Sequence, residues 1–366
     1  MNSWQYHNPV AVTFGWGCLS QLPAKLKGRR AVVVTFPQAQ DTGLLSSLKA
    51  LLGSQLAGVV DDVEPNPELS WVSRHYRDFW KSYADCVVVA VGGGSVMDSA
   101  KMFLPGVASG EFQDIHAALA RSEVPAVQCA LPMIAVPTTA GTGSEVTPWA
   151  TLWDRTSTKH QKYSLHLQQT WPEAAVVDPA LTLSLPHTVT RDSGLDALSH
   201  ALEAIWNVNA NPVSDGLAVM AARTVLHNLP ALLDKPHDEA LRTLASKASL
   251  LAGLAFSNTR TALAHNISYE MTLKHGLSHG LACSFTLPLV WRLAQGKNAD
   301  RDAVLQQVFG ASVSDPADAL EQFLSRLGVS TQFKDYGVSD DEAQALVQTS
   351  MQGPRGRNFI GSHKNA

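Results

Sequence analysis

The sequence lacks several features that would point to a partner or a membrane. It contains no block of Lys or Arg, and its formal net charge is −4 over 366 residues. Nucleic-acid binding normally depends on a basic patch, so no nucleic-acid partner is expected. The longest apolar runs have the length of β-strands and fall well short of a membrane span, so no membrane partner is expected either.

Cysteine is scarce in this chain. Cys18, Cys86, Cys129 and Cys283 are scattered and form no CxxC pair. They have no pattern typical of a nucleophile, so we interpret them as reduced core residues. The stretch 1–6 has neither a basic segment nor an apolar one, which predicts no secretory signal. Together these features predict a cytoplasmic protein.

The first half of the chain alternates short apolar runs with helical patterns. Apolar residues make up 45% of the sequence and charged residues 16%, as in globular enzymes. Runs rich in β-branched residues without in–out alternation predict strands buried on both faces. The expected strands are Ala31–Phe36, Ala57–Val63, Cys86–Val91, Met133–Val136 and Ala174–Val177, and helices are expected near 42–52, 67–83 and 95–104. This is the βαβ rhythm of a doubly wound parallel sheet.

The second half shows helical periodicity and almost no strand signal. Helices are expected at 190–207, 212–233, 238–256, 261–273 and 301–327, with prolines near their ends. A further helix is expected from His279 to Pro288. The predicted fold class is therefore α/β plus all-α, with an α/β dinucleotide-binding domain over 1–185 and an all-helical metal-binding domain over 186–366.

Two glycine-containing loops each follow an expected strand. The first, Gly92–Lys101, reads as a glycine turn and a helix start, where free backbone N–H groups suit a phosphate. Taken alone, it could equally be a tight turn in which Ser95 caps a helix. The second, Pro137–Glu145, is dense in hydroxyls and glycines. Two such loops at strand ends would share one edge of a parallel sheet, which favours a nucleotide site.

Acidic and histidine side chains recur in the helical half. Asp196 and His200 stand at i and i+4 on an otherwise apolar helix, a spacing that suits two ligands of one metal. A hydrogen-bonded Asp–His pair without metal is an equal alternative. His265 and His279 could join them, because one carboxylate and three imidazoles make a divalent-metal site. A protein with a purely structural metal would leave the two glycine loops without a role.

Five stretches carry a family resemblance: GGGSVMDSAK at 92–101, PTTAGTGSE at 137–145, DP at 178–179, GLDALSH at 194–200 and HG at 279–280. In this order and spacing the chain resembles the iron-containing (group III) alcohol dehydrogenases over nearly its whole length. The resemblance implies a dehydroquinate synthase-like fold and a homodimer. It implies NAD or NADP as cofactor and Fe²⁺ as the metal, with Zn²⁺ as an option because divalent-metal affinity favours it.

The resemblance also implies site residues. It gives Asp196, His200, His265 and His279 as metal ligands. It gives the following cofactor contacts: Gly93, Gly94, Ser95 and Asp98 near the pyrophosphate, Thr138, Thr139, Ser144 and Val146 on the nicotinamide side, and Lys162 as the cofactor-contacting lysine.

Two positions depart from the family pattern. Many members carry a second histidine, assigned to proton relay, four residues after the first late ligand, and here that position is Tyr269. We therefore name Tyr269 and His275 as candidate catalytic residues. Many NAD-specific members read Thr-Asp after the first strand, whereas this chain reads Thr35-Phe36. An acid there would repel a 2′-phosphate, so its absence predicts that NADPH is tolerated.

The predicted activity is reversible hydride transfer between a nicotinamide cofactor and a short alcohol–aldehyde pair. The segments 203–212 and 258–269 look most like the phosphonoacetaldehyde reductase branch, which favours reduction of an anionic aldehyde. Arg260, five residues before His265, is the candidate substrate anchor, although it could simply cap a helix end. The alternatives are a glycerol-type polyol dehydrogenase and a dehydroquinate-synthase-like cyclase. The cyclase should need a lysine-rich pocket, which the sequence does not offer near the ligands.

Overall fold

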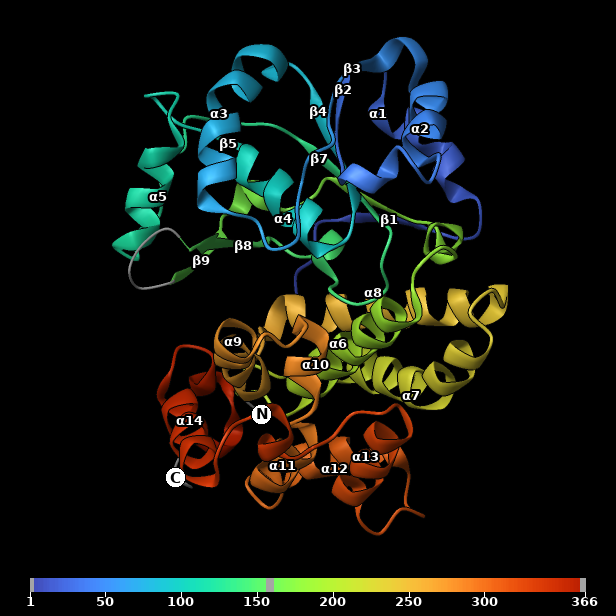
Figure 1. The fold of residues 1–366 in the computed structure, drawn as a ribbon, viewed down its shortest axis with the longest axis vertical. Helices are drawn as coiled ribbons and strands as arrows, with labels where there is room; N and C mark the ends of the chain where they lie inside the picture. Colours follow the sequence, from blue (N-terminus) through green and yellow to red (C-terminus); the bar gives the residue numbers. More distant parts are fainter. Residues whose placement is uncertain (1–2, 156–160, 363–366) are drawn as a thin grey trace. The chain divides into compact units, whose positions relative to one another are not determined.

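The computed structural model describes residues 3–155 and 161–362 (Figure 1). The chain divides into two compact units. The sheet unit comprises Pro9–Thr138 and Ser144–Leu181, and the helical unit comprises Met1–Asn8, Thr139–Gly143 and Thr182–Ala366. The sequence predicted a single boundary after residue 185, whereas the structure changes unit after Leu181 and places two earlier short segments in the helical unit.

A six-stranded parallel sheet forms the middle of the sheet unit, with strand order β1-β10-β7-β4-β2-β3. Every residue of the four inner strands is buried, which explains their runs of valine and other apolar residues. The strands are β1 (Ala11–Phe14), β2 (Ala31–Val34), β3 (Leu56–Val60), β4 (Val87–Gly92), β7 (Met133–Pro137) and β10 (Ala174–Val177).

Helices cover both faces of this sheet. On one face, Val32 and Val88 pack into a core with α3 (Leu69–Tyr83), α4 (Gly94–Phe103) and α5 (Phe112–Ala120). On the other face, alternate strand residues pack with α1 (Leu22–Leu26) and α2 (Leu44–Leu52). Successive strand residues point to opposite faces, so one valine-rich strand supplies both cores. The doubly wound sheet predicted from the sequence is confirmed.

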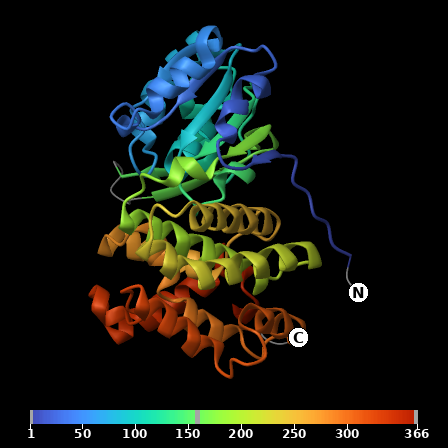
Figure 2. The ribbon, with the colours of Figure 1, turned by 90° about the vertical axis from the view of Figure 1, so that its right-hand side faces the viewer.

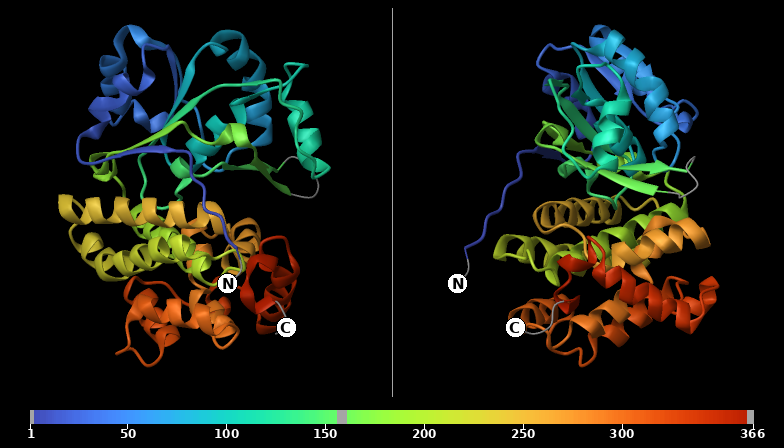
Figure 3. Two further views of the ribbon diagram at one scale, coloured as in Figure 1. Left: turned by 180° about the vertical axis from the view of Figure 1, so that it is seen from behind. Right: turned by 90° about the vertical axis from the view of Figure 1, so that its left-hand side faces the viewer.

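The sheet unit contains elements that the sequence did not predict. An antiparallel hairpin pairs β8 (Trp149–Asp154) with β9 (Gln161–His166), and β9 packs against α5 (Figure 3). A second, two-residue pairing joins β5 (Pro105–Gly106) to β6 (Cys129–Ala130). The hairpin adds cover to the same face of the sheet as α3 and α4, because Leu152 and Leu165 lie in that core.

The helical unit is built around three long helices, α6 (His187–Ile205), α7 (Pro212–Asp234) and α8 (Glu239–Thr259), which pack against one another (Figure 2). The remaining helices are α9 (Leu263–His275), α10 (His279–Ser284), α11 (Leu287–Ala294), α12 (Ala299–Phe309), α13 (Pro316–Arg326) and α14 (Asp340–Gln352). Helices α9 and α10 both contact α6 and each other. The predicted all-helical second half is therefore confirmed.

Two predicted helices are each divided in the structure. The helix expected from His279 to Pro288 stops at Ser284, and α11 starts afresh with Pro288 at its second position, where a missing N–H costs nothing. The helix expected at 301–327 is two helices, because Gly310 ends α12 with a φ of 81° and Asp315 caps α13.

One helix of the described part of the chain, α7, is long and apolar enough to cross a membrane by length and composition alone. Its apolar residues have a different use here. Ala218, Ala222 and Leu229 are buried, and the helix packs on α6 and α8. Helix α7 therefore packs as a core helix of the helical unit.

Candidate metal centre

Helix α6 brings the first two candidate ligands to one buried face. Asp196 and His200 lie one turn apart, and every residue from Gly194 to Ile205 is buried. The Nδ1 atom of His200 lies 3.7 Å from Oδ1 of Asp196. Burial lowers the pKa of His200 to about 4, so its ring is neutral at pH 7, the form that binds a metal.

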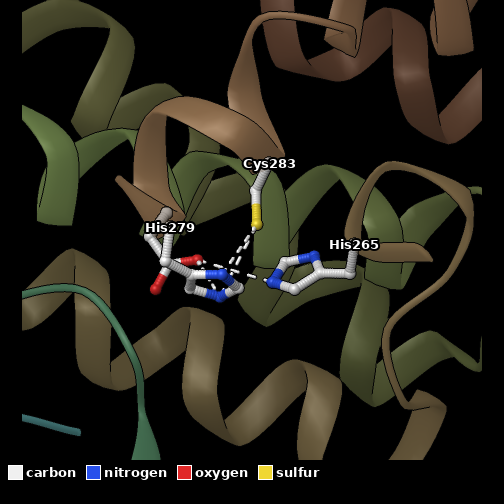
Figure 4. Close-up of side chains that lie close together, drawn as sticks. His265, His279 and Cys283 are labelled. Carbon is white, nitrogen blue, oxygen red and sulfur yellow. Dashed lines mark hydrogen bonds and ion pairs between the residues drawn. The ribbon is translucent and has the colours of Figure 1, made fainter. Parts of the chain in front are cut away.

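Helices α9 and α10 bring the other histidines to the same carboxylate (Figure 4). The Nε2 atom of His265 lies 3.4 Å from Oδ1 of Asp196, and that of His279 lies 3.8 Å from it. Helix α10 approaches α6 closely because residue 280 is glycine. A Cβ there would collide with the backbone carbonyl oxygen of Asp192. All three histidines predicted as ligands therefore lie within 4 Å of Oδ1 of Asp196, although Nδ1 of His200 is also 3.3 Å from the carbonyl oxygen of Gly141.

Glu203, one turn beyond His200 on α6, holds His265 in place. Its carboxylate accepts a hydrogen bond from Nδ1 of His265 at 2.7 Å and from the backbone N–H groups of Ala262 and His265 at 2.8 and 3.1 Å. Burial raises the pKa of Glu203, but the neighbouring His265 and these hydrogen bonds outweigh it, and the pKa lies below its usual value. The bond fixes the proton on Nδ1 and leaves Nε2 facing Asp196.

Cys283 is a further member of this cluster, and the sequence analysis assigned it to the core. Its Sγ lies 3.6 Å from Nε2 of His279, and the ligand atoms of Asp196, His265, His279 and Cys283 all lie within 4.8 Å of one another. The i, i+4 spacing of His279 and Cys283 repeats that of Asp196 and His200. That repetition was the signal available in the sequence.

The donor set fits a divalent cation. Within residues 3–155 and 161–362, Oδ1 of Asp196 and Nε2 of His265 are buried without a hydrogen-bond partner. Buried polar atoms are nearly always satisfied, and a buried carboxylate needs a partner or an ion. An ion at this point would satisfy both atoms at once. Carboxylate, imidazole and thiol groups are together the ligands of zinc and of related transition metals.

Three other residues of the helical unit were predicted as catalytic or substrate-binding residues: Tyr269, His275 and Arg260. Tyr269 follows His265 by one turn of α9 and is half-buried, and burial of its hydroxyl raises its pKa. The guanidinium of Arg355 stacks 4.9 Å above its ring. His275 is the last residue of α9 and is not among the side chains that meet at Asp196. Arg260 ends α8 with a φ of 69° and an exposed side chain, a position that suits a helix end.

In the sheet unit, the two glycine-containing loops start at the same edge of the sheet. Strands β4 and β7 are neighbours, Gly92 pairs with Pro137, and the N–H of Thr138 donates to the carbonyl of Gly92 at 3.0 Å. Gly93 is the N-cap of α4 and Gly94 its first residue, so free N–H groups lie at this edge. The Ser95 hydroxyl accepts a hydrogen bond from the N–H of Asn66 at 3.1 Å.

Two residues predicted to contact the cofactor, Asp98 and Ser144, make hydrogen bonds within the sheet unit. The Asp98 carboxylate accepts hydrogen bonds from the Ser144 hydroxyl at 3.0 Å and the Thr151 N–H at 2.9 Å. Lys101 donates to the Ser144 hydroxyl and to the carbonyls of Ser144 and Trp149, at 2.7–2.9 Å. These bonds fix the Ser144 end of the second loop against α4.

The remaining predicted contacts differ in exposure. Val146 is completely buried, Thr138 is 6% exposed and Thr139 is half-buried. The ammonium of Lys162, on β9, lies 4.8 Å above the ring of Trp153. The structure therefore places these residues in the loop after β7 and on the adjoining hairpin.

Comparisons with known proteins cover both units. Residues 9–179 match the family described as iron-containing alcohol dehydrogenase, and residues 190–363 match its C-terminal domain. Long-chain-alcohol dehydrogenase 1 of Geobacillus thermodenitrificans is 31% identical over 93% of this chain and 88% of its own length. The NAD-dependent methanol dehydrogenase of Bacillus methanolicus is 28% identical over 94% of this chain and 92% of its own length.

Solved structures agree with the sequence comparisons. Sulfoacetaldehyde reductase from Bifidobacterium kashiwanohense, solved in complex with NAD⁺, superimposes with a TM-score of 0.88 and 30% identity. The match covers 98% of this chain and 95% of that one. A 1,3-propanediol oxidoreductase superimposes with a TM-score of 0.84 and 26% identity over 98% of this chain and 96% of its own.

Proposed function

The chain belongs to the iron-containing alcohol dehydrogenase family, and from that premise we propose that it reduces a short aldehyde with an anionic head group. The reductant would be NADH or NADPH. Asp196, His200, His265 and His279 would hold a divalent ion. The observation that carries the proposal is the convergence of three imidazoles on one buried carboxylate whose Oδ1 has no hydrogen-bond partner among the described residues.

An ion held by Asp196 and the histidines would polarise a carbonyl oxygen, and a nicotinamide bound at the sheet unit would supply the hydride. The residues of this chain orient the ligands and set the charge around the ion. Glu203 keeps His265 in one tautomer with Nε2 toward Asp196. The Asp196 carboxylate brings a negative charge that offsets part of the charge of the ion. Tyr269, one turn from His265 on α9, is the candidate for moving a proton to or from the product oxygen.

The cofactor would contact the sheet unit at the edge where β4 and β7 end. Free N–H groups at Gly94 and Ser95 suit a pyrophosphate. No carboxylate follows β2, where Thr35 donates its hydroxyl to the carbonyl of Val91 at 2.8 Å and Phe36 packs on the core. We therefore propose that a 2′-phosphate is tolerated. Steady-state rates with NADH and NADPH test this, and a thousandfold preference for NADH would contradict it.

The anionic substrate rests on two observations. One is the likeness to a sulfoacetaldehyde reductase over nearly the whole chain. The other is Arg260, which precedes α9, the helix that carries His265, and whose exposed guanidinium is available for a sulfonate or phosphonate. Phosphonoacetaldehyde is the leading candidate, from the branch resemblance of the sequence.

The test compares kcat/KM for phosphonoacetaldehyde, sulfoacetaldehyde, succinic semialdehyde and butanal. We expect the anionic aldehydes to be preferred, and Arg260→Ala to remove that preference without changing the rate with butanal. Arg326→Ala, at an exposed position on α13, is the matched control. Equal use of butanal by the unaltered enzyme would rule out an anion site.

A polyol dehydrogenase is the second candidate, favoured by the likeness to 1,3-propanediol oxidoreductase. It predicts oxidation of 1,3-propanediol and glycerol at rates well above the reduction of every anionic aldehyde. Measuring both directions with the same metal-loaded preparation separates the two functions.

A further inference from the structure

The cysteine of α10 stands where a metal ligand would stand. Cys283 lies one turn after His279 on the same helix, and its Sγ is 3.6 and 3.7 Å from the two ring nitrogens of His279 (Figure 4). The sulfur is within 4.8 Å of the ligand atoms of Asp196 and His265 as well. No other described cysteine lies in such a group, because Cys18, Cys86 and Cys129 are in the sheet unit, away from these residues.

The sulfur is held in this position by the packing of α10. The backbone carbonyl of Cys283 accepts a hydrogen bond from the Ser199 hydroxyl of α6 at 3.1 Å, and both residues are fully buried. Ser199 lies between Asp196 and His200 in sequence. The contact that docks α10 on α6 therefore also fixes the distance from the sulfur to the carboxylate.

A second, independent observation points to a ligand at this place. Asp196 is 3% exposed and His265 is 1% exposed, and Oδ1 of the former and Nε2 of the latter are without a hydrogen-bond partner in the described part of the chain. Both atoms face the group that includes the sulfur. An ion placed to satisfy them is thus within reach of the thiol.

We propose that Cys283 binds the metal ion as a thiolate, in addition to the ligands Asp196, His200, His265 and His279 of the proposed site, and that it favours a thiophilic ion such as Zn²⁺ or Co²⁺. Binding releases the thiol proton to solvent and forms one metal–sulfur bond, with no change of oxidation state. Sulfur ligands favour zinc-like ions over harder ones. The inference rests on the proposed metal site and adds a ligand to it.

The experiment uses the full chain, stripped with a chelator and titrated with Co²⁺ alone. The unaltered protein should show visible d–d bands and, in addition, a near-ultraviolet sulfur-to-cobalt charge-transfer band. Cys283→Ser should lose the charge-transfer band and keep the d–d bands. Cys129→Ser, at the exposed cysteine, should keep both. Zn²⁺ affinity, measured by competition with a chromophoric chelator, should fall roughly tenfold or more in Cys283→Ser.

The outcomes separate this inference from the proposed metal site. Co²⁺ binding with d–d bands but without the charge-transfer band overturns the role of Cys283 and leaves the histidine site intact. Failure of the unaltered protein to bind Co²⁺ or Zn²⁺ overturns both. Cys283→Ala provides a second variant with a small apolar side chain, and far-ultraviolet circular dichroism verifies that each variant is folded. Equal Zn²⁺ affinity in a folded Cys283→Ala would also overturn the inference.

Discussion

Each unit of this protein contains a cluster of charged side chains, and the two clusters differ in whether their polar atoms have hydrogen-bond partners. In the sheet unit, both oxygens of Asp98 accept hydrogen bonds and Lys101 donates three. In the helical unit, Oδ1 of Asp196 and Nε2 of His265 have no hydrogen-bond partner among the described residues. Asp196 is buried and Asp98 is half-buried, so the carboxylate with less access to water is the one that lacks a partner.

The contrast distinguishes a cluster that maintains the fold from one that binds a ligand. A fully hydrogen-bonded buried network stabilises a unique arrangement, and losing one partner leaves an uncompensated charge. A cluster with unsatisfied atoms costs free energy until something completes it. The hydrogen-bonded charges of the sheet unit thus hold a loop in place, whereas the unsatisfied atoms of the helical unit agree with its proposed role in binding an ion.

The largest expected effect is the loss of metal and activity in Asp196→Asn. The amide keeps the size of the side chain but removes the charge that the other ligands surround. Turnover should fall by roughly a thousandfold or more, because the ion contributes several kcal/mol to the reaction. Metal content by elemental analysis and kcat/KM for an aldehyde are the measurements. Full metal content at the unaltered rate would show that Asp196 is not a ligand.

The same substitution also tests the contrast between the two clusters through the free energy of unfolding. In the metal-free protein, Asp196→Asn should lower the free energy of unfolding, but by less than Asp98→Asn. Burial raises the pKa of Asp196, but the imidazoles around it hold that pKa below its usual range and so stabilise its charge, whereas its Oδ1 has no hydrogen bond to lose. Asp98→Asn should lower the free energy of unfolding more, because the amide leaves Lys101 without its opposite charge. Denaturant unfolding of both metal-free variants is the measurement. A larger loss of stability in Asp196→Asn than in Asp98→Asn would contradict the inferred difference between the two clusters.

The next effect in size is the destabilisation by Lys101→Met. Methionine fills a similar space but removes the ammonium that binds Ser144 and Trp149 and interacts with the half-buried Asp98. The free energy of unfolding should fall by about 3–5 kcal/mol, the cost of leaving a buried charge unpaired. Lys81→Met, at an exposed position of α3, should change it by less than about 0.5 kcal/mol. A loss in Lys101→Met no larger than in this control would mean that the network is not structural.

The architecture was largely predictable from the sequence because its inner strands are buried on both faces. A run such as Val87–Val91 leaves little choice other than a central strand. The edge strand β1 was missed, and its residues are exposed or half-buried, so its apolar signal is weak. The hairpin of β8 and β9 was also missed, because β9 is mostly exposed or half-buried and its apolar signal is weak. The break at Gly310 and Pro316 was available as helix stop and start signals.

The candidate site was predictable where spacing carries information. Asp196 and His200 are one turn apart, and the family resemblance supplied His265 and His279. Cys283 was missed because a lone cysteine in an apolar helix is usually a core residue. The roles of Glu203 and Lys101 depend on residues 62 and 43 positions away, His265 and Ser144. Sequence spacing cannot reveal a partnership of that kind.

The smallest expected effect concerns the remaining acid of the sheet-unit network. Burial raises the pKa of Glu145 from 4.5 to about 7, against the lowering influence of its own backbone hydrogen bond and of Lys101. Between pH 4.5 and 7 the folded protein therefore retains a proton that the unfolded chain has released. The unfolded state then binds fewer protons, so this group makes the free energy of unfolding fall as pH rises, by at most about 1.4 kcal/mol per pH unit.

Glu145→Gln should flatten this decline, because the amide does not titrate, whereas Glu239→Gln at an exposed position of α8 should preserve it. Lys101 acts in a separate window, because burial lowers its pKa from 10.5 to about 8. Between those values the unfolded chain binds the extra proton, so the contribution of Lys101 to stability rises with pH. Denaturant unfolding of the metal-free protein from pH 5 to 10 resolves both slopes. If the free energy of unfolding of Glu145→Gln still declines between pH 5 and 7, another group causes the decline. The pKa of Glu145 in the fold would then not be raised as inferred.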